Sequence, residues 1–149
     1  MKVLNTLILS GLLATSGFAF NNMPSALGEI TNHARTLQKE AQTMSQQLKN
    51  KQVDKQLLEQ KIATVEQNVA KLRELVASVE SSNPELTPSQ KQNWELIKTK
   101  VELLNIFTNY KKDLVANDDI QKKRGILRAH ANGIARRAAL LEQTASKTL

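Results

Sequence analysis

Residues 30–80 read ITNHARTLQKEAQTMSQQLKNKQVDKQLLEQKIATVEQNVAKLRELVASVE. At alternating steps of four and three residues this stretch has fifteen seam positions, and only Lys51 and Lys55, at its middle, are polar. A repeat near 3.5 residues, held over about seven heptads, predicts one long helix that packs its apolar stripe against another helix. The apolar seam positions are Ile30, Ala34, Leu37, Ala41, Met44, Leu48, Leu58, Ile62, Val65, Val69, Leu72, Val76 and Val79.

Turn and capping residues divide the chain into three predicted helices. The first covers about 24–80 and ends before Pro84, because a proline disfavours the helical conformation of the residue before it. The second covers about 88–116: Thr87 can cap it, Pro88 suits the first helical position, and Gln90 completes a capping box. The third covers about 118–147 and follows a phase shift of the apolar repeat at residues 116–119, which indicates a kink or a turn.

The predicted fold class is therefore all-α, with residues 20–149 forming a single helical coiled-coil domain. The first helix and the remaining helical part have nearly equal lengths, of roughly 85 Å each at 1.5 Å per residue. This equality favours a long antiparallel helical hairpin whose return arm is kinked. The alternative is a three-helix bundle, in which the last helix folds back again.

The two polar seam positions predict a layer that specifies the register of the hairpin. With the hairpin centred near Pro84, Lys51 and Lys55 lie opposite the acidic cluster that contains Asp113 and Asp118. A buried lysine is tolerated when an acidic partner satisfies it, and such a pair can fix register. The alternative is that both lysine side chains extend to water. The same hairpin places the alanine-rich start of the first helix against the alanine-rich third helix, so that the two could approach closely.

The first nineteen residues have the pattern of an export signal. Lys2 provides the positive start, residues 4–14 are an apolar run too short to span a bilayer, and Gly17-Phe18-Ala19 is a small-x-small cleavage site. Cleavage would leave a mature chain that begins at Phe20 and has no transmembrane span. We therefore expect a periplasmic or secreted protein, and because the sequence has no cysteine it has no disulfide framework.

The sequence contains no pattern typical of an enzyme. The two histidines, His33 and His130, lie far apart in the chain and have no nearby cysteine, so they are a weak metal signal. No glycine-rich phosphate loop, nucleophile elbow or metalloprotease helix motif occurs. We therefore expect no catalytic residues, no metal site and no cofactor.

Charge is the remaining indication of function. The chain has 21 basic and 14 acidic residues, a net charge of +7, and removal of Lys2 with the signal would leave +6. The excess lies in the third helix, which predicts a basic binding face. Its members are Lys122, Lys123, Arg124, Arg128, Arg136 and Arg137.

These features favour an exported, non-enzymatic helical protein of the bacterial envelope that acts by binding, as a scaffold or a chaperone-like surface. The alternative is a membrane-peripheral or surface protein that binds anionic lipid or polymer through its basic helix. The expected partner is a protein or an anionic envelope component. Nucleic acid is not expected, because the export signal removes the chain from the cytoplasm and the basic helix has no stacking aromatic residues. Assembly into a homo-oligomer is left open.

Residues 86–90, Leu-Thr-Pro-Ser-Gln, resemble the Leu-Thr-x-x-Gln motif of the Spy/CpxP family of periplasmic helical chaperones and stress proteins. The resemblance covers five residues and one copy of a motif that the family usually has twice. It implies an exported all-helical protein with a basic surface and no enzymatic activity. The capping box at Thr87 and Gln90 gives the same residues a purely local role.

Overall fold

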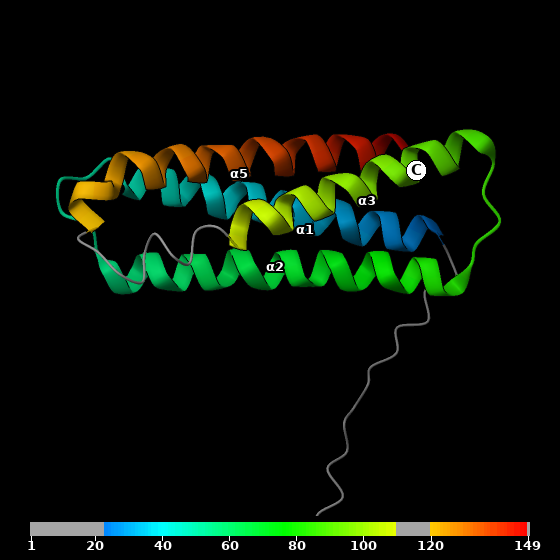
Figure 1. Cartoon of the computed structure of the whole chain (residues 1–149), viewed down its shortest axis with the longest axis horizontal. Helices are drawn as coiled ribbons and strands as arrows, with labels where there is room; N and C mark the ends of the chain where they lie inside the picture. The colour runs from blue at the N-terminus through cyan, green and yellow to red at the C-terminus, as the bar shows by residue number, and fades with distance from the viewer. Residues whose placement is uncertain (1–22, 110–119, 149) are drawn as a thin grey trace, which may run out of the picture.

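The computed structural model describes residues 23–109 and 120–148, and these ranges are almost entirely helical. They contain the four helices α1 (Met23–Gln47), α2 (Lys55–Ser82), α3 (Pro88–Asn109) and α5 (Ile120–Thr148) (Figure 1). No strand occurs in the described ranges. The prediction of an all-α fold is confirmed, and none of these helices is long and apolar enough to cross a membrane.

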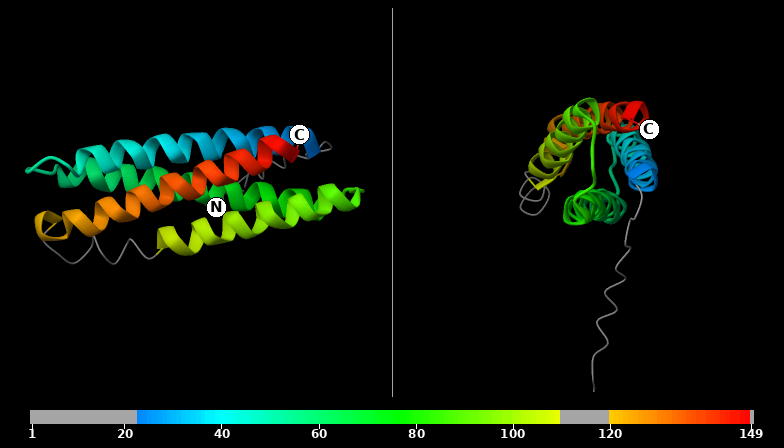
Figure 2. Two further views of the ribbon diagram at one scale, coloured as in Figure 1. Left: turned by 90° about the horizontal axis from the view of Figure 1, so that it is seen from above. Right: turned by 90° about the vertical axis from the view of Figure 1, so that its right-hand side faces the viewer.

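The four helices form an antiparallel bundle in which each helix runs opposite to the one before it (Figure 1). The main contacts join α1 with α2, α2 with α3, α3 with α5, and α5 with α1. Figure 2 shows the four helices side by side from above and from one end. Buried residues of all four helices form the main core, and a smaller cluster from α1, α2 and α5 lies near the turn between α1 and α2. Each pair of neighbouring helices meets along a seam, so the bundle has four seams.

The predicted single helix over 24–80 is wrong, because the chain turns between α1 and α2. The heptad pattern nevertheless identified the buried residues: eleven of its thirteen apolar positions are buried, and the other two, Ile62 and Val76, are half-buried. Each half of the repeat forms the apolar stripe of one helix, α1 or α2, and each stripe packs against the common core. An uninterrupted repeat is therefore compatible with two antiparallel helices as well as with one long helix.

Local hydrogen bonds explain why the chain turns at residues 48–54. The end of α1 tightens, since the amides of Lys49 and Asn50 bond to carbonyls three residues earlier, those of Gln46 and Gln47. Asp54 then caps α2, because its side chain accepts a hydrogen bond from the amide of Leu57 at 3.1 Å. Lys49, Asn50 and Asp54 are polar, so they provide no apolar contact that would favour one helix continuing through them.

The start of α5 holds this turn in place. Arg124 Nη1 donates to the carbonyl of Asn50 at 2.6 Å. The Gln121 amide, oriented by its partners, donates to the carbonyl of Lys51 at 2.6 Å and accepts from the amide of Val53 at 2.9 Å. Backbone groups of the turn are thus satisfied by side chains about seventy residues away in sequence, a partnership that no local pattern could reveal.

The predicted kinked return arm is also wrong. α3 and α5 are antiparallel neighbours, so they do not form one arm that runs along a first helix (Figure 1). The three-helix alternative expected that the last helix folds back, but it did not include the turn between α1 and α2. In a two-helix hairpin each stripe would face a single partner, whereas the bundle buries the stripes of four helices in a common core.

α1 and α5 form the most extensive interface of the bundle. Their antiparallel register is marked at one end by the bond from Arg35 Nε to Glu142 Oε1, at 2.9 Å, and at the other by the bond from Arg124 to Asn50. Carried along both helices at helical spacing, this register is expected to set buried large side chains opposite small ones. The pairs that follow from it are Ile30 with Ala145, Ala34 with Leu141, Leu37 with Ala138, Ala41 with Ile134, and Met44 with Ala131, and all ten residues are buried.

The predicted boundaries around residues 80–90 agree closely with the structure. α2 ends at Ser82, and Asn83 follows in the left-handed conformation at φ 45°, ψ 57°, before Pro84. The capping box of α3 is formed: the Thr87 amide donates to Gln90 Oε1 at 3.0 Å, and the Gln90 amide donates to Thr87 Oγ1 at 3.3 Å. The motif at residues 86–90 is accordingly accounted for by helix capping.

Replacing Asp54 with alanine tests the turn between α1 and α2. We expect Asp54→Ala to lower the free energy of unfolding by about 1 kcal/mol, because the α2 cap is lost. In a continuous helix the same change would instead raise stability, since alanine is the best helix former. Urea unfolding followed by circular dichroism measures the difference. Asp54→Asn keeps a capping oxygen and is the matched control, which should stay within about 0.5 kcal/mol of wild type.

Candidate binding surfaces

Some of the residues predicted to form a register-specifying layer lie in the described ranges, and these are not buried between helices. Lys51 lies in the turn after α1, Lys55 is the first residue of α2, and both are exposed. Lys55 pairs with Glu59 one turn along the same helix, at 3.7 Å. Their predicted partners, Asp113 and Asp118, lie outside the described residues, so that pairing stays a prediction.

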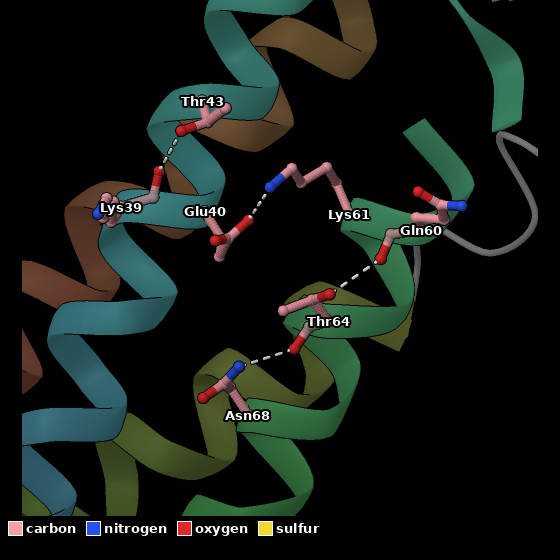
Figure 3. A network of polar contacts seen from close by, with 7 residues as sticks. All are labelled: Lys39, Glu40, Thr43, Gln60, Lys61, Thr64 and Asn68. Carbon is pink, nitrogen blue, oxygen red and sulfur yellow. Dashed lines mark hydrogen bonds and ion pairs between the residues drawn. The ribbon is translucent and has the colours of Figure 1, made fainter. Parts of the chain in front are cut away.

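The seam between α1 and α2 is closed by polar contacts. Lys61 Nζ of α2 donates to Glu40 Oε2 of α1 at 2.6 Å, and both side chains are mostly covered (Figure 3). Two helical turns away, His33 Nδ1 lies 3.0 Å from Asn68 Oδ1. Asn68 Nδ2 donates to the carbonyl of Thr64 at 2.9 Å (Figure 3), which leaves Asn68 Oδ1 as the atom that faces the imidazole. His33 is therefore the hydrogen-bond donor of this pair.

Ion pairs also cross two further seams. Between α2 and α3, Lys98 pairs with Glu80, and Arg73 approaches Glu102 at 3.7 Å. The hydrogen bond to Glu80 raises the pKa of Lys98 above its usual value, although desolvation opposes this shift. Between α1 and α5, Arg35 pairs with Glu142 at 2.9 Å. Three of the four seams thus have opposite charges in contact across them.

The seam between α3 and α5 is closed differently, by the ring of Phe107. The Arg137 guanidinium lies over this ring, 4.0 Å from its centroid, and Arg137 Nη1 also donates to the carbonyl of Gly133 at 3.1 Å. The His130 ring lies 5.0 Å from the Phe107 ring, centroid to centroid. Gly133 provides the space, because a Cβ atom built there would lie 2.8 Å from Phe107 Cζ. No ion pair joins α3 to α5 within residues 88–109 and 120–148.

Exposed apolar side chains gather along this same seam. Helical spacing puts Leu96 and Leu103 in the row of α3 that contains Phe107, and Ile126 and Leu140 in the row of α5 that contains Gly133. Ile106 follows Glu102 by one helical turn, so it lies on the outer side of α3 and not in the row of Phe107. Leu96, Leu103, Ile126 and Leu140 are 47% to 53% exposed, Ile106 is 60% exposed, and the one other large exposed apolar side chain in the described residues, Leu57 of α2, is 38% exposed. We call the four residues Leu96, Leu103, Ile126 and Leu140 the α3–α5 face.

The structure separates the members of the predicted basic face. Arg124 is engaged with the turn after α1, and Arg137 is stacked on Phe107. Arg128 and Arg136 are exposed and form no ion pair within the described ranges. Lys122 is exposed and Lys123 is half-buried. Among the described residues of α5 the single acidic one is Glu142, which pairs with α1, so the outward side of this helix is basic and apolar.

The two histidines lie on different seams, His33 against α2 and His130 against α3. In the part of the chain that the structure describes, no group of three or more His, Cys, Asp or Glu side chains could hold a metal ion.

Sequence reasoning missed the α3–α5 face, although part of its signal was present. Leu96 and Leu103 lie off the apolar stripe of the second predicted helix, and Ile126 and Leu140 lie off that of the third. Such off-stripe apolar residues are candidates for a surface patch. Only the pairing of α3 with α5 brings the two sets together.

Comparisons with known proteins give no relative: no family model matches the chain, and no curated protein or solved structure is significantly similar to it. The resemblance at residues 86–90 has no support from these comparisons.

Two glycine substitutions in α5 test the packing of Phe107. We expect Gly125→Ala to raise the free energy of unfolding by up to about 1 kcal/mol, because alanine favours the helix and nothing lies within 4 Å of the new Cβ atom. Gly133→Ala has the same helical advantage but must displace the Phe107 ring and its contact with Arg137. We expect it to be less stable than Gly125→Ala by about 1 kcal/mol or more. Equal effects in urea unfolding would contradict the described packing.

Proposed function

We propose that the protein is an exported, non-enzymatic helical protein that binds other proteins, as a scaffold or a chaperone-like surface of the bacterial envelope. Export rests on the signal pattern of residues 1–19, which lie outside the described residues. N-terminal sequencing of the exported protein should begin at Phe20. The binding role rests chiefly on one observation, the position of four half-exposed leucine and isoleucine side chains along the seam rows of the α3–α5 face.

The location of this apolar surface supports a binding role more than its size does. Scattered exposed apolar residues are ordinary, but a contiguous group on one face marks an interaction site more often. Here the group follows the seam that has no ion pair across it in the described ranges. The other three seams have polar and charged pairs over the core. A partner on the α3–α5 face would therefore cover apolar side chains without first breaking an interhelical ion pair.

Aggregation of reduced insulin tests the chaperone-like role, and the reductant leaves this chain intact because it has no cysteine. We expect the wild-type protein to delay the rise in light scattering. The double variant Leu96→Ser, Leu103→Ser should lose most of this effect, since it removes two apolar side chains from the α3–α5 face. Leu57→Ser, on α2, is the matched control and should act like wild type. An inactive wild type, or equal activity of all three proteins, would contradict this role.

A second candidate function, binding of anionic lipid, is favoured by the charge of α5. Its exposed side chains include Lys122, Arg128, Arg136 and Lys147, while its one described acidic residue pairs with α1. These charges flank Ile126 and Leu140 on the exposed part of α5, with Arg128 on the side towards α1, and such a basic and apolar surface suits an anionic membrane.

Vesicle sedimentation tests this second candidate. Vesicles that contain phosphatidylglycerol should retain the protein at low salt, and vesicles of phosphatidylcholine alone should not. The double variant Arg128→Gln, Arg136→Gln should bind several-fold less, since each basic residue near an anionic surface contributes about 1 kcal/mol. Retention that is insensitive to these substitutions and to salt would exclude electrostatic binding through α5.

A further inference from the structure

The charges around the α3–α5 face indicate which protein segments it would accept. Lys100 lies in the same row of α3 as Leu96 and Leu103, at helical spacing. On α5, Arg136 is one turn before Leu140, and Lys147 is two turns after it. These three cations form no ion pair within the described ranges. They border the exposed apolar side chains on both helices.

The acidic residues of the two helices are directed elsewhere. On α3, Glu95 contacts Lys98, and Glu102 approaches Arg73 of α2. On α5, Glu142 is paired with Arg35 of α1. The α3–α5 face is thus apolar along its seam and bordered by cations, with the described carboxylates of α3 and α5 on its far sides.

From this arrangement we propose that the α3–α5 face binds an amphipathic helical segment of a protein partner whose polar side is acidic. Leucine or isoleucine side chains of the segment would cover Leu96, Leu103 and Leu140. Its carboxylates would meet Lys100, Arg136 and Lys147, which the bundle itself leaves unpaired. Two neighbouring antiparallel helices with a seam between them suit a helix laid along that seam. The proposal rests on the proposed protein-binding function and names the chemistry of its partner.

A second copy of this chain fits the face less well. Two copies that met through it would bring Lys100, Arg136 and Lys147 of each into one interface, and the chain has a net charge of +7. Like charges brought together in an interface oppose association. The carboxylates that could offset them are engaged in the bundle's own pairs. Charge complementarity therefore favours an acidic partner.

Three designed peptides test the proposal against the full protein. Each is an amphipathic helix of about five turns, roughly 18 residues. All three have the same leucine stripe, and their polar positions are glutamate, glutamine or lysine. Fluorescence anisotropy of the labelled peptides measures Kd. We expect the glutamate peptide to bind about tenfold more tightly than the glutamine peptide at low salt, since three exposed charge pairs each add a modest factor. The lysine peptide should bind most weakly, and the differences should shrink as salt rises.

Two substitutions assign the effect to the face. Lys100→Gln with Arg136→Gln should remove most of the preference for glutamate over glutamine. Arg128→Gln is the matched control: it removes an exposed, unpaired charge from the side of α5 that, by helical spacing, faces α1 through Arg124 and Glu142. It should leave the preference unchanged.

The outcomes distinguish this proposal from the general one. If the glutamate and glutamine peptides bind equally well and Leu96→Ser with Leu103→Ser weakens both, the apolar face binds proteins but the acidic partner is wrong. If no peptide binds, the face is not a helix-binding surface and this proposal fails, whereas the general protein-binding role is decided by the insulin assay. If Arg128→Gln abolishes the preference as completely as the double variant does, the protein's overall charge is responsible and the assignment to this face is wrong.

Discussion

The close packing of α1 against α5 is the constraint on which the rest of the structure depends. Their register is expected to set large buried side chains opposite small ones along both helices, so the two backbones can approach and hold that register. The pair joins the two ends of the described chain. It therefore requires the segments between them, α2 and α3, to return over the other side of the same core. The hydrogen bond from Arg124 to the carbonyl of Asn50 is an example, because it joins α5 to the turn between α1 and α2.

The four seams of the bundle differ in a way that bears on binding. Ion pairs cross three of them, and the exposed ones, such as Arg73 with Glu102, add little stability individually. Their consequence for the surface is that charges neutralise one another and aliphatic stems cover the core edge. At the fourth seam the ring of Phe107 lies between α3 and α5, where the other seams have an ion pair. The cations that border the α3–α5 face form no ion pair within the described ranges. A difference in seam chemistry thus gives an all-helical bundle one distinctive face.

The basic character of α5 has more than one role in the structure. Arg124 and Arg137 act within the fold, one on a backbone carbonyl of the turn and the other on an aromatic ring. Arg128 and Arg136 leave their charges in solvent. A run of arginines in a sequence thus combines structural and surface residues, and three-dimensional contacts are needed to separate them. Substituting all of them at once would confound stability with binding, because the first two would be expected to unfold the turn or loosen α3.

The sequence alone determined the helical class, the stripes that are buried and the boundaries around residues 80–90, because periodicity and capping act within a few residues. It did not determine that residues 48–54 form a turn. A heptad repeat has the same appearance in one long helix and in two antiparallel ones, and Asp54, the capping residue, gave only a weak local signal. The tertiary structure decided which helices are neighbours, because that choice depends on side chains such as Leu37 and Ala138, about one hundred residues apart, fitting together. It also created the α3–α5 face, which exists only because two off-stripe apolar rows from separate helices meet.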